Sequence, residues 1–336
     1  MLKRILHGIL PGLGVLLLVL DSRTALKSAT DGIDLCIRSI IPSIFPFLVL
    51  SGMLVAALSG IRFGRLGRLL GIPAGCEGLF ALGLLGGYPT GAREVANAWK
   101  QGAFSTDDAR RMIAFCNNAG PSFLFGILGS VFQEKWMLWL LWAIHILSAV
   151  CVGILLPKTG RPATRHYIIE APTMTDALKH AVATMSYICG WVIFFRMVIG
   201  FADRWVLWAA PTSLRVGIYG LFELANGCCS LSLLPTDTQR LVFCSGMLAF
   251  GGLCVTMQTA SVVGKLGMGI YLPAKILQAC ISMILSMLCC YFLFSGNGID
   301  QFLSIIAVGI VGLLTFWCVK RGNMKNRTSI PQAIHV

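Results

Sequence analysis

Two stretches in the first half of the chain place polar side chains beside glycine and proline within apolar sequence. The first reads Gly-Gly-Tyr-Pro-Thr-Gly-Ala-Arg at residues 86–93, and the second reads Cys-Asn-Asn-Ala-Gly-Pro at residues 116–121. Glycine and proline interrupt helices, and a membrane tolerates the freed backbone groups only where protein buries them or they line a cavity. Transporters build substrate sites from such broken helices. The pattern therefore favours recognition of a small polar or anionic solute.

Each side chain in these stretches has a chemical use and a plainer structural alternative. The ring of Tyr88 can stack on a flat solute, and Arg93 favours an anion unless it only extends to the membrane surface. The adjacent amides of Asn117 and Asn118 can bind a ligand or a neighbouring helix, and we expect one of them to face a cavity. The candidate substrate-binding residues of this half are Tyr88, Thr90, Gly91, Arg93, Asn117, Asn118 and Gly120.

A second set of polar residues and glycines lies in the later half of the chain. Glu223 is the lone acid of its apolar stretch, and we expect it either to bind a coupling ion or proton or to pair with Arg93 or Arg196. Lys275 lies close to the start of an apolar span, and we expect its amine to extend to the membrane surface. The candidate substrate-binding residues of this half are Glu223, Asn226, Gly251, Gly252 and Gln258.

Motifs of the common enzymes are missing from the sequence. There is no HExxH, GxSxG or GxxxxGK[ST] pattern, and the five histidines are scattered. Most of the thirteen cysteines lie within apolar spans, as small hydrophobic residues do. We therefore expect no enzyme activity, no catalytic residue, no metal site and no cofactor, and the identity of any coupling ion stays open.

Composition assigns the chain to the membrane. Of its 336 residues, 56% are hydrophobic and 12% are charged, whereas soluble domains carry about 25% charged residues. The net charge of +13 comes from bases in short loops between apolar runs, which is typical of membrane topology and does not indicate a nucleic-acid partner. We expect an all-α polytopic protein whose partners are the lipid bilayer and a small-molecule substrate. Self-association into a homo-oligomer stays open.

Apolar runs and breaks predict about eight transmembrane helices and two re-entrant hairpins. An uncleaved first span is preferred to a signal peptide because a good cleavage site is missing, and residues 21–38 suit an interfacial helix. The hairpins are expected at residues 74–99 and 216–234. The spans are expected at residues 5–20, 39–58, 112–131, 136–156, 183–201, 241–263, 269–294 and 302–319.

The order of hairpin, capped helix and glycine-broken span occurs twice, which predicts an inverted repeat. With both termini in the cytosol, 17 of the 27 bases fall on the cytosolic side and 7 on the other, as the positive-inside rule requires. This arrangement brings the two hairpins in from opposite faces. The predicted units are a first span and interfacial segment (1–38), a first repeat (39–157), a connector (158–182), a second repeat (183–294) and a last span with a basic tail (295–336).

The same motifs resemble those of a known family. Residues 86–93 and 115–121, together with Phe-Glu-Leu-Ala-Asn-Gly at 222–227 and Phe-Gly-Gly-Leu-Cys-Val at 250–255, resemble the YlbJ/SpoVV sporulation integral membrane proteins over roughly residues 30–295. That family belongs to the nucleoside-recognition (Gate) group and is similar to concentrative nucleoside transporters. The resemblance implies a paired-hairpin transporter that moves dipicolinate across the outer forespore membrane during sporulation.

Three functions remain to be compared. Dipicolinate is a small planar dianion, so half-helix N-termini, an arginine and the Tyr88 ring would suit it. A nucleoside is neutral, so Arg93 would then need a counter-charge such as Glu223. A scaffold of spore assembly that transports nothing would tolerate apolar replacements at Asn117, Asn118 and Gln258, whereas a transporter would not.

Overall fold

The computed structural model describes residues 2–59, 61–158 and 172–294, and it contains helices and no strands within these ranges. The expected all-α class is therefore confirmed. The predicted last span and basic tail, and most of the predicted connector, lie outside the described residues.

Six helical segments of the described ranges are long and apolar enough to cross a membrane, and they match the second to seventh predicted spans. The first predicted span forms helix α1 (Leu2–Leu20), of which Pro11–Leu20 is a shorter apolar segment. The six segments are Ser22–Leu54, Thr106–Ser130, Lys135–Leu155, Met174–Trp205, Asp237–Leu266 and Tyr271–Tyr291.

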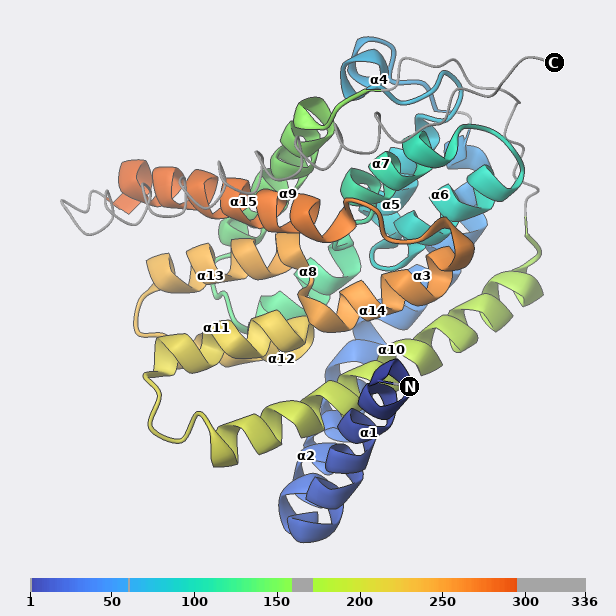
Figure 1. Ribbon diagram of the computed structural model, residues 1–336. Helices are drawn as coiled ribbons and strands as arrows, with labels where there is room; N and C mark the ends of the chain where they lie inside the picture. Colours follow the sequence, from blue (N-terminus) through green and yellow to red (C-terminus); the bar gives the residue numbers. More distant parts are fainter. Residues whose placement is uncertain (1, 60, 159–171, 295–336) are drawn as a thin grey trace.

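The chain builds the same order of elements in both halves (Figure 1). A long helix is followed by a pair of half-helices, then by a helix broken in its middle, and then by another long helix. In the first half these are α2 (Ser22–Leu35) with α3 (Ile41–Ser59), α5 (Gly78–Gly86) with α6 (Thr90–Lys100), α7 (Thr106–Cys116) with α8 (Pro121–Ile127), and α9 (Lys135–Leu155). In the second half they are α10 (Met174–Trp205), α11 (Thr212–Phe222) with α12 (Leu224–Cys229), α13 (Asp237–Phe250) with α14 (Gly252–Val263), and α15 (Tyr271–Phe294).

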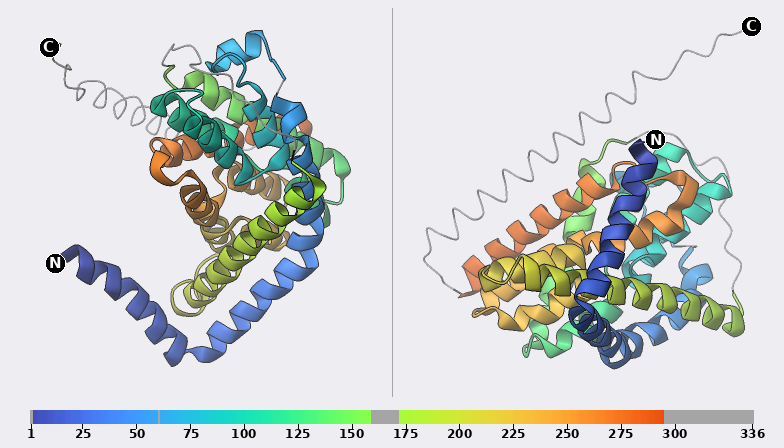
Figure 2. Two further views of the ribbon diagram at one scale, coloured as in Figure 1. Left: turned by 90° about the vertical axis from the view of Figure 1, so that its right-hand side faces the viewer. Right: turned by 60° about the horizontal axis from the view of Figure 1, so that its bottom comes forward.

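Short elements connect these helices. Helix α4 (Arg65–Leu70) follows α3, and 3-10 turns at Leu128–Ser130, Ser230–Leu233 and Gly264–Leu266 follow α8, α12 and α14. A π-helical turn at Cys36–Ile40 joins α2 to α3 with helical backbone angles on both sides. Because helices α2 and α3 form one long helix with α10 beside it (Figure 2, left), residues 21–38 are not the separate interfacial helix expected from the sequence.

Helix α10 also begins earlier than expected. Its first residue is Met174, because the Thr173 side chain accepts a hydrogen bond from the Asp176 N–H at 3.2 Å and caps the helix. The last part of the predicted connector is therefore helical, and the predicted start at Ala183 lies inside α10. Polar composition misled the sequence prediction here, because a well-capped helix can extend beyond its apolar part.

Glycine contacts fold each pair of half-helices back on itself. A Cβ atom on Gly91 of α6 would lie 2.9 Å from the Gly83 Cα of α5, and a Cβ on Gly227 of α12 would lie 2.3 Å from the Gly220 Cα of α11. Contacts this close need residues without a side chain. Figure 1 shows α5 and α6 on the right and α11 and α12 on the left, with their turns directed to the middle of the protein. Their re-entry into a membrane stays a prediction.

Candidate functional site

Four helix breaks meet near the centre of the protein, two from each half. They lie between α5 and α6, between α7 and α8, at Glu223 between α11 and α12, and at Gly251 between α13 and α14. Within the first half, a Cβ on Gly120 would lie 3.0 Å from the Gly87 Cα, and within the second, a Cβ on Gly252 would lie 3.4 Å from the Glu223 nitrogen. Backbone thus packs against backbone at the breaks.

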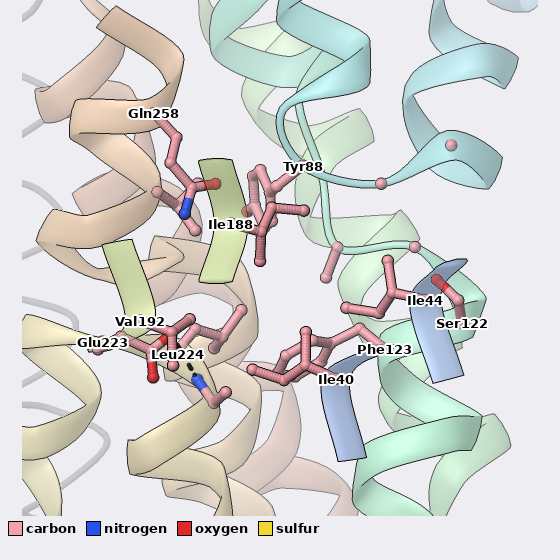
Figure 3. Close-up of a pocket in the computed structure, with 16 residues that line it drawn as sticks. Ile40, Ile44, Tyr88, Ser122, Phe123, Ile188, Val192, Glu223, Leu224 and Gln258 are labelled. Atoms are coloured by element: carbon pink, nitrogen blue, oxygen red, sulfur yellow. Dashed lines mark hydrogen bonds between the residues drawn. The ribbon is translucent and has the colours of Figure 1, made fainter. Parts of the chain in front are cut away.

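A pocket opens between these breaks (Figure 3). It contains about 520 Å³ of empty space, part of which is open to solvent. Four predicted site residues line it: Tyr88, Gly120, Glu223 and Gln258. Apolar walls come from α3, α8 and α10, through residues such as Ile44, Phe123 and Ile188. An aromatic ring and a few polar groups on apolar walls are the usual composition of a small-molecule site.

Tyr88 joins the two halves at this pocket. Its hydroxyl donates a hydrogen bond to the Leu248 carbonyl oxygen at 3.1 Å, at the C-terminal end of α13. A Cβ on Gly251 would lie 3.3 Å from the Tyr88 ring, and Gly251 has a φ of +81°, so a larger residue there would be both crowded and strained. This hydrogen bond fixes the hydroxyl end of the Tyr88 side chain, and the ring lines the pocket.

Glu223 holds the start of α12. Its Oε1 accepts a hydrogen bond from the Ala225 N–H at 3.0 Å, and its Oε2 accepts from the Asn226 N–H at 2.6 Å and from the Asn226 side-chain amide at 2.7 Å. The Asn226 amide is therefore used to hold Glu223. Pairing with Arg93 or Arg196, one of the two alternatives for Glu223, is not found among the described residues, because Arg196 pairs with Asp31 at 2.9 Å and Arg93 with Glu94 at 3.4 Å.

Gln258 is the side chain best placed to contact a solute. It lies two turns into α14, and Figure 3 shows its amide directed toward Tyr88 across the pocket. The amide nitrogen donates to the Cys254 sulfur at 3.2 Å, and within the described ranges its carbonyl oxygen has no hydrogen-bond partner. This carbonyl oxygen can accept a hydrogen bond from a ligand without breaking an existing one.

Asn117 and Asn118 are fully buried, and neither lines the pocket. The Asn117 amide nitrogen donates to Thr259 at 2.9 Å and to Tyr271 at 3.0 Å, and its oxygen accepts from the Ala92 N–H at 3.3 Å. The Asn118 amide donates to the Phe115 carbonyl oxygen and accepts from Gln278. We expected one of the two amides to face a cavity, whereas the structure uses both to join the α7–α8 break to α14 and α15.

Lys275 is a central residue that the sequence prediction misplaced. Its side chain is fully buried, and Nζ donates to the Asn117 carbonyl oxygen at 2.9 Å and to the Gln278 Oε1 at 2.6 Å. Nζ also lies 5.1 Å from the centre of the Tyr88 ring, within cation–π range. The amine does not extend to the surface, because the α7–α8 break frees a carbonyl group to receive it. The signal for it was a charge inside an apolar span.

The remaining predicted site residues lie around the pocket. Arg93 lines an adjoining cavity, where Nη1 donates to Thr184 at 3.2 Å, and this cavity shares Ile188 and Gln258 with the pocket. Gly91 packs against a backbone carbonyl of α7, and Gly252 against one of α11. The Thr90 hydroxyl is buried and has no hydrogen-bond partner among the residues that the structure describes.

Comparison with known proteins supports the resemblance seen in the motifs. No family model matches the chain, and no solved structure matches it significantly. The chain is 24% identical over 293 residues to the sporulation integral membrane protein YlbJ of Bacillus subtilis (strain 168), covering 72% of this chain and 71% of that protein. The apolar helices described above agree with an integral membrane protein. The chain is thus a homologue of YlbJ and a membrane protein.

Proposed function

We propose that this protein is a membrane transporter of a small aromatic anion, and that its substrate is dipicolinate. The observation that carries the proposal is the meeting of four helix breaks, two from each half, around one pocket. Secondary transporters place substrate sites at the interface of two repeats, where discontinuous helices expose backbone groups. The pocket offers such an interface, with Tyr88, Glu223 and Gln258 in its lining.

Several features of the pocket suit a flat ring with two carboxylates. The Tyr88 ring provides a surface for stacking, and the apolar residues Ile44 and Phe123 form the walls. The first turn of α14 begins at Gly252 beside the pocket, and a helix N-terminus favours negative charge. Arg93 in the adjoining cavity provides a positive charge along the approach. The sporulation role in the name of the homologue supports a place in the outer forespore membrane.

A nucleoside is the second candidate, and a specific observation favours it. Within the described residues the pocket lining contains one acid, Glu223, and no base. A neutral ring with hydroxyl groups would stack on Tyr88 and donate a hydrogen bond to Gln258, and Glu223 would not repel it as it would a dianion. The two candidates differ in charge, so a direct comparison of solutes separates them.

Uptake by the purified protein in liposomes tests the proposal. Radiolabelled dipicolinate should enter protein-containing liposomes faster than empty ones, and excess unlabelled dipicolinate should compete while uridine should not. Uptake of uridine alone would establish the nucleoside function. If neither solute enters from either side, with the protein folded and correctly inserted, the transporter proposal is wrong and the scaffold alternative gains support.

A further inference from the structure

A third cavity, with a polar lining, lies beyond the pocket, between α2, α10 and α11. It contains about 1050 Å³ of empty space, including its open mouth. Its polar wall comes from Thr24, Ser28 and Asp31 on α2, and from residues of α10 and α11 opposite. We call it the basic cavity because its lining contains Arg23, Lys27, Arg196, Arg204 and Arg215 against the two acids Asp31 and Asp203.

Ion pairs leave positive charge in excess in this cavity. Asp31 pairs with Arg196 at 2.9 Å, and Asp203 pairs with Arg215 at 3.0 Å. The base Arg204 pairs at 2.9 Å with Asp21, which lies outside the cavity lining. Arg23 and Lys27 are both exposed and have no ion pair within the described ranges. Two bases are therefore free to meet an anion.

Helix α10 connects the basic cavity with the pocket. Residues four apart along a helix form a continuous ridge, and the ridge of α10 passes three cavities in turn. Thr184 lines the cavity of Arg93, Ile188 and Val192 line the central pocket, and Arg196 and Gly200 line the basic cavity. The Arg93 cavity shares residues with the pocket, whereas the basic cavity shares none and begins one helical turn beyond Val192.

We propose that the basic cavity is an anion-binding vestibule for small dianions, and the second mouth of the path that passes the pocket. This rests on the proposed transport function. Unpaired bases in a concave site raise the local concentration of anions and speed their arrival, and arginine binds carboxylates in a two-pronged geometry. The ion pair of Arg196 with Asp31 lies in the vestibule lining, and Arg196 is one helical turn from Val192 of the pocket lining. A lipid phosphate has the same chemistry, and the test below separates the two sources.

Charge-selective labelling of a cysteine in the cavity tests the vestibule. Thr24→Cys, in a cysteine-depleted background, puts a thiol in the lining while keeping the backbone cap to Asp21. At low salt a negatively charged thiosulfonate should react there at least about fivefold faster than a positively charged one, since one extra unit charge at contact distance in water has roughly this effect. Adding both Arg23→Gln and Lys27→Gln to this variant should remove its preference for the negatively charged reagent. Millimolar dipicolinate should slow the reaction.

Two controls make the outcome decisive. A cysteine at exposed Gln239, outside the cavity and predicted to lie on the same side of the membrane, should show little preference and no protection. Arg38→Gln, which removes an exposed base of the same long helix outside the cavity, should leave the preference of Thr24→Cys unchanged. Equal reaction of Thr24→Cys with both reagents, or no protection by dipicolinate, would overturn the proposal.

A separate measurement tests whether the cavity binds a lipid phosphate instead. If phosphatidylglycerol added to nanodiscs of neutral lipid slows the labelling of Thr24→Cys and dipicolinate does not, the cavity binds a lipid headgroup and the vestibule proposal is wrong. Labelling measures binding without transport, so it can succeed when liposome uptake fails. Uptake without protection at Thr24→Cys would reject the vestibule and leave the transport function standing.

Discussion

The polar residues near the central pocket fall into two groups, those that line the pocket and those whose hydrogen bonds hold the helices around it. Tyr88, Glu223 and Gln258 line the pocket, although the first two also make hydrogen bonds that hold the surrounding helices. Asn117 and Lys275 do not line the pocket. Lys275 satisfies the Asn117 carbonyl oxygen at the α7–α8 break, and the Asn117 side chain satisfies the Ala92 N–H in the first turn of α6. A buried polar group without a partner is costly, so the second group is needed for folding before any solute is bound.

Gln258→Leu tests the first group. Leucine is similar in size and suits an apolar helix, so the variant should fold and insert normally. It removes a lining side-chain amide oxygen that has no protein partner within the described residues, so the half-saturating substrate concentration should rise about ten- to a hundredfold. The measurement is the concentration dependence of uptake in liposomes. Thr256→Val, on the same helix outside the pocket lining, is the matched control and should keep normal uptake.

Asn117→Leu tests the second group and should act on stability. It leaves the Ala92 N–H without its acceptor and removes the amide donor shared by Thr259 and Tyr271. Each buried group left unpaired costs about 1–3 kcal/mol, so the melting temperature in detergent should fall clearly. Asn97→Leu makes the same replacement at a half-buried amide of α6 and should melt near wild type. A wild-type melting temperature for Asn117→Leu would show that the network contributes little.

At the scale of elements, the breaks depend on close backbone packing as much as on their polar residues. The half-helices α5 and α6 are short, and isolated helices of this length are marginal in water. Their position comes from glycine contacts with each other and with the end of α7, where the Cys116 carbonyl lies against Gly83 and Gly91. Gly91, predicted to bind substrate, is explained in this structure by packing.

Gly91→Ala should therefore destabilise the protein. Its Cβ would lie 2.1 Å from the Cys116 carbonyl oxygen, so α6 must move away from α7. Overpacking of this kind costs about 1–3 kcal/mol, and thermal melting of the purified protein measures it. Gly129→Ala is the control, because no atom lies within 4 Å of the added Cβ. Equal melting of both variants would remove the packing explanation of Gly91.

At the scale of the whole molecule, the repeated order of elements supports an inverted repeat. Figure 1 shows the turn from α6 to α7 on the right and the start of α13 on the left. The bond of Arg110 to the Leu266 carbonyl oxygen at 2.8 Å puts the turn after α14 beside α7, at the same end as the α6–α7 turn. Loops that correspond in the two halves thus lie at opposite ends of the protein.

Single cysteines at Gln101 and Gln239 should therefore label from opposite sides of the membrane. Both residues are exposed, one after α6 and the other at the start of α13. The positive-inside rule predicts that position 101 faces the cytosol. A thiol reagent that cannot cross the membrane, added to cells and to inverted vesicles, makes the measurement. Labelling of both positions from one side would refute the inverted repeat.

The sequence by itself determined where helices can form and where they cannot continue. Long apolar runs specify spans because backbone groups in lipid must bond within a helix. Glycine and proline interrupt helices, so those at 86–91 and 120–121 mark two of the four breaks, and Gly251 marks a third. The predicted class, six of the spans and the presence of two helix pairs follow from these local rules.

Only the tertiary structure decided which polar side chain does which task. Tyr88 and Asn117 donate hydrogen bonds to residues more than 140 positions away in the chain, on α13, α14 and α15. Spacing along one helix specifies a face of that helix but not what packs against it. Lys275 has a buried place because a carbonyl freed by another helix receives its amine. Which polar residues line the pocket and which hold the surrounding helices therefore depends on hydrogen bonds between distant segments, and no local sequence pattern encodes these bonds.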